Sequence, residues 1–331
     1  MNVDISAIER EYAQKRANAL KSNELLIKKV YDSSPEIKDI DNDIKKLGIE
    51  ASRSALSPNS EEKRKRLSTL LEKIETLKNK KTKILNTNGI SLEPKYECEK
   101  CKDTGYVTIN MVSQMCSCMK QKIIDYSYNK FNPFNISNST FDNFDESLYS
   151  GTSNIEKYGT NTSPRDNIIK IKKLSLDFIN NFENENTKNM LFIGSAGVGK
   201  TFLSGCIANE LLKTGHTVLY QTTPLLMDSI FDFKYGSKSK ISQELYESLF
   251  NVDLLVIDDL GTESQTSAKF AELFTIINTR MLNPKTKTII STNLDIPILA
   301  KLYDDRVMSR LIGNYSICKF FGDDLRSKKG R

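Results

Sequence analysis

A phosphate-binding loop is the feature that most constrains the fold of this sequence. Residues 194–201 read GSAGVGKT and match the pattern G-x-x-x-x-G-K-[ST], in which glycines let backbone N–H groups curl around phosphates. The apolar run MLFI precedes the loop, and a helix is predicted at 201–212, so the motif lies between a strand and a helix N-terminus. This context predicts an α/β nucleotide-binding domain.

Individual residues of the loop have distinct predicted roles. Lys200 is expected to contact the β- and γ-phosphates, and the Thr201 hydroxyl is expected to bind Mg²⁺. The loop and the first turn of the helix give the predicted nucleotide contacts: Gly194, Ser195, Ala196, Gly197, Val198, Gly199, Lys200, Thr201 and Phe202. The predicted ligands of this site are ATP and Mg²⁺.

Two further strands carry polar side chains at their ends. The run LLVIDD ends in Asp258 and Asp259, at the sheet edge where ligands of open α/β folds bind. Asp258 is predicted to hold Mg²⁺, usually through water, and Asp259 either acts as the general base or caps the next loop. Asn293 ends the strand TIIST, and it either orients the attacking water or reads the γ-phosphate, unless it only forms a turn.

Apolar strands alternate with helices from about residue 164 onward, which predicts a parallel sheet covered on both faces. The five candidate strands are 189–194, 217–221, 253–258, 287–292 and 317–321. A nucleotide-binding domain is therefore expected at 164–331, preceded by an Asn-, Phe- and Ser-rich linker at 129–163.

The region 1–86 is rich in Lys, Glu and Leu and is predicted to be helical. Its clearest apolar stripe consists of Leu67, Leu70, Ile74 and Leu77. Pro35 and the turn at 57–59 are expected to divide the region into three helices. Lys81 occupies the next position of the stripe, which argues against a long coiled coil.

Four clustered cysteines define a small module at 87–128. Cys98 and Cys101 form a C-x-x-C pair, and Cys116 and Cys118 form a C-x-C pair after a 14-residue spacer. Two thiolate pairs at this distance favour a structural, tetrahedral Zn²⁺ site over redox or unliganded thiols. The second pair departs from the commoner C-x-x-C spacing. Cys206 and Cys318 lie in apolar patterns and are predicted to be core residues.

Composition and charge restrict the setting only broadly. No apolar run approaches the roughly 20 residues of a membrane helix, and the N-terminus lacks a secretory signal, so a cytoplasmic protein without a membrane partner is expected. The formal net charge of +6 modestly favours an anionic partner such as nucleic acid, and a Lys-rich solvated surface explains it equally well.

The motifs together resemble those of AAA+ ATPases in order and spacing. VIDDLG at 256–261, IISTNL at 289–294 and DRVMSRL at 305–311 are similar to the DnaC/DnaI helicase-loader family and to its relatives, the IstB-type transposition helpers. The resemblance covers about residues 95–326. It implies an α/β fold with an AAA+ P-loop core and a parallel five-stranded sheet, preceded by the helical region and the zinc module.

The resemblance also implies roles for residues that spacing alone would leave unassigned. Arg310 is expected to be the arginine finger that reaches a neighbouring subunit, with Arg306 as the second candidate, and Arg326 is expected to contact nucleotide in its own subunit. Phe144, in the segment TFDNF, is expected to flank adenine, although a hydrophobic staple in the linker is the alternative.

An insertion at 222–249 matches the extra helical segment of loaders. Its Lys234, Tyr235, Lys238 and Lys240 suit single-stranded DNA, and an ordinary solvated helix fits equally well.

The function implied by the resemblance is an ATP-dependent loader. Such a protein binds the replicative DnaB-type hexameric helicase through its N-terminal region, self-associates through the AAA+ domain, and helps place the helicase on single-stranded DNA in replication initiation or restart. The alternative is an IstB-like transposition helper that acts on target DNA. The cysteine module argues against this, because IstB-type proteins generally lack one. A third possibility is an adaptor that holds ATP and scarcely hydrolyses it.

Overall fold

The computed structural model describes residues 5–55, 61–127, 138–236, 240–264 and 266–327. Contacts divide the chain into two compact units, with Ser6–Ser113 in one and Gln114–Arg331 in the other. Each unit has its own set of packed elements. Within the described ranges, no helix combines the length and the apolarity needed to cross a membrane.

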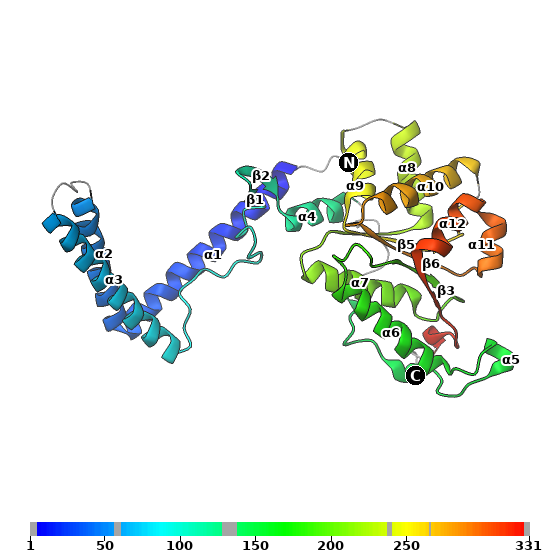
Figure 1. Cartoon of the computed structure of the whole chain (residues 1–331), viewed down its shortest axis with the longest axis horizontal. Helices are drawn as coiled ribbons and strands as arrows, with labels where there is room; N and C mark the ends of the chain where they lie inside the picture. The colour runs from blue at the N-terminus through cyan, green and yellow to red at the C-terminus, as the bar shows by residue number, and fades with distance from the viewer. Residues whose placement is uncertain (1–4, 56–60, 128–137, 237–239, 265, 328–331) are drawn as a thin grey trace. The chain divides into compact units, whose positions relative to one another are not determined.

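Three helices dominate the first unit, as the sequence predicts: α1 (Ile5–Ser33), α2 (Pro35–Ala55) and α3 (Glu61–Thr87). Pro35 is the first residue of α2, a position where its missing N–H costs no helical hydrogen bond. Helices α2 and α3 lie side by side (Figure 1). The predicted turn at 57–59 lies outside the described residues. A short hairpin follows, formed by β1 (Tyr106–Ile109) and β2 (Val112–Met115).

Lys81, the polar residue in the apolar stripe of α3, has a partner in the structure. Its Nζ donates hydrogen bonds to the Asp41 carboxylate on α2 at 2.6 and 2.7 Å, and the Tyr31 hydroxyl of α1 donates to the same carboxylate at 2.6 Å. The hydrogen bond to Asp41 raises the pKa of Tyr31 to about 12. One carboxylate thus joins all three helices, and the polar residue that interrupts the stripe is paired within the helical region.

The second unit is an α/β fold. It begins with α4 (Ser117–Ser127), η3 (Glu146–Leu148), α5 (Ile155–Tyr158) and α6 (Pro164–Asn180). The sheet and its helices follow: β3 (Asn189–Ile193), α7 (Lys200–Lys213), β4 (Val218–Thr222), α8 (Thr223–Tyr235), α9 (Lys240–Asn251), β5 (Leu254–Leu260), α10 (Ser267–Leu282), β6 (Lys287–Thr292), α11 (Ile296–Leu302), α12 (Asp305–Asn314), β7 (Tyr315–Lys319) and η4 (Leu325–Ser327).

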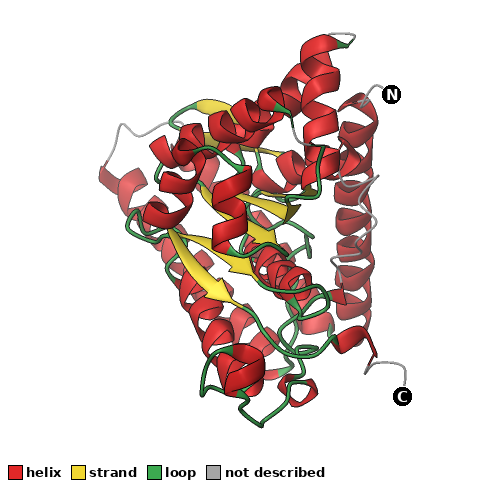
Figure 2. Ribbon diagram, turned by 90° about the vertical axis from the view of Figure 1, so that its right-hand side faces the viewer, coloured by secondary structure: helices red, strands yellow, loops and turns green. Residues whose placement is uncertain are grey.

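The five strands form one parallel sheet in the order β4-β5-β6-β3-β7, which confirms the predicted fold class. The predicted bounds of β6 match the structure, whereas the predicted last strand begins two residues late. Alternate residues of each strand enter different cores. Leu255 of β5 belongs to the core under α8 to α12, and its neighbour Val256 belongs to the core that includes residues of α6 and α7. Helices therefore cover both faces (Figure 2).

Helix α4 is hydrogen-bonded to β4 at the edge of this sheet. The side-chain amide of Gln121 donates to the carbonyl of Val218 at 2.9 Å and accepts from its N–H at 2.7 Å. Ile124 of the same helix is buried in the core. Because β4 is an edge strand, the amide of Gln121 replaces the hydrogen bonds of a missing neighbour. The sequence groups α4 with the cysteine module, and the structure packs it against the α/β unit.

Candidate nucleotide-binding site

The phosphate-binding loop joins β3 to α7, and its backbone requires glycine. Gly194, Gly197 and Gly199 have φ values of 148°, 79° and 94°, which are strained for residues with a side chain. A Cβ on Gly194 would lie 2.2 Å from the Phe320 carbonyl oxygen. The spacing of the glycines therefore reflects both conformation and close approach.

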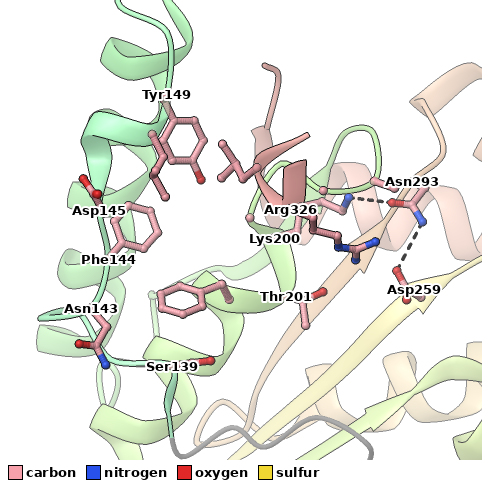
Figure 3. A pocket seen from close by; sticks show the side chains of 16 residues that line it. Ser139, Asn143, Phe144, Asp145, Tyr149, Lys200, Thr201, Asp259, Asn293 and Arg326 are labelled. Carbon is pink, nitrogen blue, oxygen red and sulfur yellow. Dashed lines mark hydrogen bonds between the residues drawn. The ribbon is translucent and has the colours of Figure 1, made fainter. Parts of the chain in front are cut away.

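Lys200, the first residue of α7, is almost buried, with 5% of its surface exposed. Its ammonium group donates to the carbonyl oxygens of Gly194 at 2.7 Å and Ser195 at 2.8 Å, and to Asn293 Oδ1 at 2.8 Å (Figure 3). An ammonium has three N–H donors, so these acceptors satisfy it completely. Burial lowers the pKa of Lys200, although the carboxylates of Asp259 and Asp258 oppose that shift.

The two acidic residues at the end of β5 have different surroundings. Asp258 is fully buried, and its oxygens accept hydrogen bonds from the hydroxyls of Ser291 and, at 2.8 Å, Tyr220. Asp259 instead lines the pocket, because a φ of +56° and a register shift between Ile257 and Leu260 redirect the chain. Positive φ at a residue other than glycine is uncommon and recurs at functional sites.

Asp259, Asn293 and Lys200 form a connected set (Figure 3). The Asn293 amide donates to Asp259 Oδ1 at 3.4 Å while its carbonyl oxygen accepts from Lys200. Burial and the neighbouring Asp258 raise the pKa of Asp259, and the positive charges of Lys200 and Arg326 act in the opposite direction. Such an arrangement can hold a water molecule beside a carboxylate with a raised pKa.

A pocket of about 410 Å³ opens over the loop, a volume typical of small-molecule sites. Its polar wall includes Lys200, Thr201, Asp259, Asn293 and Arg326, all of which the sequence nominates. Its apolar wall combines Phe202 with residues of the segment before α6 and of η4: Phe144, Leu148, Tyr149 and Leu325. A polar end suited to phosphates and an apolar end suited to a base therefore occupy one cavity.

Phe144 lies in the apolar wall, where the resemblance suggests it. Its ring centroid is 6.0 Å from that of Phe202 and 6.3 Å from that of Tyr149, and the Lys172 ammonium lies 5.4 Å from it. Only 8% of the Phe144 surface is exposed. This aromatic wall could flank a nucleotide base.

Tyr220 and Tyr149 are site residues that the sequence does not nominate. The Tyr220 hydroxyl contacts both Asp258 and, at 3.4 Å, the carbonyl oxygen of Thr201, so it connects the acidic strand to the phosphate-binding loop. Tyr149 also lines the pocket, and its hydroxyl donates to the carbonyl oxygen of Val198 in the loop at 3.1 Å. Neither lies within a recognised motif, so no local signal identifies them.

The two arginines of α12 lie outside the pocket lining. The guanidinium groups of Arg306 and Arg310 each lie 5.0 Å from the centroid of the Phe274 ring on α10. Arg310 also donates to Asn278 Oδ1 at 3.2 Å, and Arg306 binds the Asp304 carboxylate at 2.7 Å. Arg326, by contrast, lines the pocket of its own chain.

The predicted DNA-binding residues of the insertion are only partly available. Lys234 pairs with Glu272 at 2.5 Å and lies 5.5 Å from the ring of Tyr246, so its charge is already compensated. Tyr235 is 74% exposed, and its ring centroid lies 5.4 Å from that of Phe231. Lys238 lies outside the described residues, as does the side chain of Lys240.

The four cysteines meet in space. The Sγ atoms of Cys98, Cys101, Cys116 and Cys118 all lie within 4.8 Å of one another. Tetrahedral zinc with Zn–S bonds of about 2.3 Å implies S–S separations of roughly 3.8 Å, so the donor set fits such an ion. Asp103, which is buried, orders the first pair by accepting hydrogen bonds from the N–H groups of Glu97 and Cys98.

The fold and the loop together define a P-loop nucleotide-binding core of the AAA+ type. The family model described as "IstB-like ATP binding protein" matches residues 149–329, more than half of the chain. The chain belongs to this family, and the predicted resemblance is confirmed.

Curated relatives include replicative helicase loaders named DnaC. The protein of Escherichia coli K12 is 33% identical over 144 residues, which cover 43% of this chain and 58% of the relative. The protein of Buchnera aphidicola subsp. Baizongia pistaciae is 31% identical over 160 residues, which cover 48% of this chain and 64% of the relative. The matched segments thus span less than two thirds of these relatives.

Among solved structures, a crystal structure of the DnaC helicase loader aligns with a TM-score of 0.45 and 23% identity, covering 56% of this chain and 98% of that one. A crystal structure of DnaI aligns with a TM-score of 0.46 and 24% identity, covering 59% and 95%.

Asn293 provides a prediction whose sign depends on the substitution. A phosphate that binds Lys200 must displace one of its three acceptors, and the rotatable Asn293 side chain is the one that can leave. Asn293→Ala should therefore bind ADP about fivefold more tightly, and Asn293→Asp should bind it more weakly. Titration calorimetry measures both, with Tyr158→Phe as a control, because Tyr158 packs against Phe321 and does not line the pocket. Equal effects of the two substitutions would contradict this competition.

Metal analysis tests the cysteine cluster. The wild-type protein should purify with zinc, and Cys98→Ser should lose it, because a hydroxyl is a much weaker zinc ligand than a thiolate. Cys206→Ser is the matched control, since Cys206 lies in the core away from the cluster. An unchanged zinc content in Cys98→Ser would rule out the assignment of this residue as a ligand.

Proposed function

We propose that this chain hydrolyses ATP at the pocket above the phosphate-binding loop. In this proposal Lys200 would bind the β- and γ-phosphates, and Thr201 would hold Mg²⁺, with Asp258 acting through water. Asp259 and Asn293 would orient and activate the attacking water. The convergence of Lys200, Asn293 and Asp259 in one hydrogen-bonded set is the observation that carries the proposal.

The arginines divide into two proposed roles according to their positions. Arg326 lines the pocket and would contact nucleotide in its own subunit. Arg310, or else Arg306, would reach the nucleotide of a neighbouring subunit, since both lie on α12 outside the pocket lining. A cation supplied in trans stabilises charge that develops in the transition state, so hydrolysis would depend on self-association.

The biological role proposed is that of a loader for the replicative DnaB-type helicase on single-stranded DNA. Support comes from the similarity of the ATP-binding region to replicative helicase loaders. The helices α1 to α3 and the cysteine cluster precede the segment matched by the family model, which leaves them available for the helicase. The exposed Tyr235 would stack on a DNA base in this proposal.

A transposition helper of the IstB type is the second candidate function. The family model that matches residues 149–329 is itself described as IstB-like, so the ATP-binding region alone favours neither role. The loader role and the transposition role therefore differ in the partner that the region before residue 149 would bind.

Mixed subunits test hydrolysis and the trans role together. Asp259→Asn should bind ATP but lose turnover, and Arg310→Ala should lose the cation that its neighbour requires. Each variant alone should be nearly inactive. A mixture should regain part of the wild-type rate, because Asp259→Asn subunits supply arginines to intact sites. The rate is measured as phosphate release. A parallel mixture combines Asp259→Asn with Arg306→Ala. If neither mixture recovers activity, the assignment of a trans-acting arginine on α12 is refuted.

Because the pKa of Asp259 is raised, the same assay has an expected pH profile. The base works only when ionised, so wild-type turnover should decline on acidification at a pH above the value of about 4 that is usual for Asp.

Co-purification distinguishes the two biological roles. The full-length chain should retain a hexameric DnaB-type helicase, because the loader proposal assigns helicase binding to the region before the ATP-binding domain. A variant that lacks α2 and α3 should bind ATP normally and retain less helicase. Binding to a transposase together with no binding to the helicase would overturn the loader proposal and favour the transposition helper.

A further inference from the structure

Two carbonyl groups at the tip of the phosphate-binding loop are held by partners from outside the loop. The Tyr149 hydroxyl donates to the carbonyl oxygen of Val198 at 3.1 Å, and the N–H of Leu325 donates to that of Gly197 at 3.0 Å. Tyr149 follows η3 in the segment before α6, whereas Leu325 begins η4 near the C-terminus. Segments from both ends of the α/β unit therefore meet at this loop.

Peptide geometry gives these contacts a consequence for phosphate binding. The C=O of one residue and the N–H of the next belong to the same planar unit and point in opposite directions. A partner that fixes the Val198 carbonyl therefore also fixes the direction of the Gly199 N–H, which points to the opposite side of the same peptide. Inward N–H groups are the donors that cradle phosphates in such loops.

We infer that Tyr149 is a positioning residue for nucleotide binding, acting through the Val198–Gly199 peptide; this inference rests on the proposed function of the loop. The hydroxyl holds the peptide in the orientation that phosphates need before any nucleotide arrives. Pre-organisation of this kind raises affinity, because binding no longer has to order the loop.

The surroundings of Tyr149 suit a fixed support. The residue is 4% exposed, its backbone carbonyl accepts a hydrogen bond from Arg165 Nε at 3.1 Å, and its ring stacks on Phe144 at an interplanar angle of 22°. The hydroxyl can approach because Gly199 has no side chain, since a Cβ there would lie 2.3 Å from it. Gly199 therefore leaves space for the Tyr149 hydroxyl and also permits a positive φ.

Phe144 and Tyr149 belong to one short segment and contact different parts of the site. Both line the pocket, with Phe144 in the wall suited to a base and Tyr149 against the loop (Figure 3). Loss of the Tyr149 hydroxyl should consequently lower the affinity for a nucleotide to an extent that depends on how many phosphates it carries. ADP and ATP, whose β-phosphates occupy the loop, depend on the Gly199 N–H more than AMP does.

The experiment is a nucleotide series on Tyr149→Phe in the full-length protein. This substitution keeps the ring and its packing and removes one hydrogen bond. The affinities for ADP and ATP should fall about fivefold, and the affinity for AMP less than about twofold. In turnover, KM should rise while kcat remains within about twofold of wild type. Tyr158→Phe is the matched control, because Tyr158 packs against Phe321 and does not line the pocket.

The outcomes separate this inference from the function on which it rests. Unchanged ADP affinity in Tyr149→Phe would overturn it, as would an equal loss for AMP and ADP, which would place the effect at the base. Thermal melting without nucleotide should show both variants folded like the wild type, because the aromatic packing is retained. Failure of the wild-type chain to bind any adenine nucleotide would instead refute the proposed function itself.

Discussion

The contact between the Lys200 ammonium and three oxygen acceptors is the interaction on which the rest of the site depends. A nearly buried cation must satisfy its donors, and two of its acceptors are carbonyls of the loop itself. The third, Asn293, belongs to the end of β6, the strand beside β3 in the sheet. Because Asn293 also contacts Asp259 on β5, one charge ties the ends of three adjacent strands together. In the proposed mechanism, a phosphate that binds Lys200 would therefore also change the contacts of Asn293 and Asp259, the residues proposed to orient water.

Those parts of the fold that depend on local pattern could be predicted from the sequence. The strand β6 is fully apolar in its centre and bounded by polar turns, and its bounds were predicted without error. Lys200, Asp259 and Asn293 could be brought together in advance because the carboxyl ends of parallel strands share one edge. The cysteine cluster could be predicted for a similar reason, since two cysteine pairs at short spacing favour a shared metal site.

Features that depend on distant contacts could not be predicted in this way. A strand periodicity assigns Asp258 and Asp259 to opposite faces, but it does not reveal that Ser291 and Tyr220 bury the first while a positive φ turns the second into the pocket. Arg280 is another example. Its guanidinium is buried and donates hydrogen bonds to the carbonyl oxygens of Leu249 and Lys287, so a residue type that is usually exposed lies in the interior here.

The segment before α6 contributes to the pocket although its composition is typical of a linker. Its Asn, Phe and Ser content is typical of a linker, which places the start of the nucleotide-binding domain at 164. Phe144 and Tyr149, however, form a wall of the pocket, and Arg165 at the start of α6 holds the Tyr149 carbonyl in place. A tyrosine buried against glycine is not a flexible connection. The pocket is therefore lined by residues that precede the sheet-forming region, such as Phe144, and by residues that follow it, such as Leu325. We propose on this ground that the nucleotide-binding domain begins before residue 164.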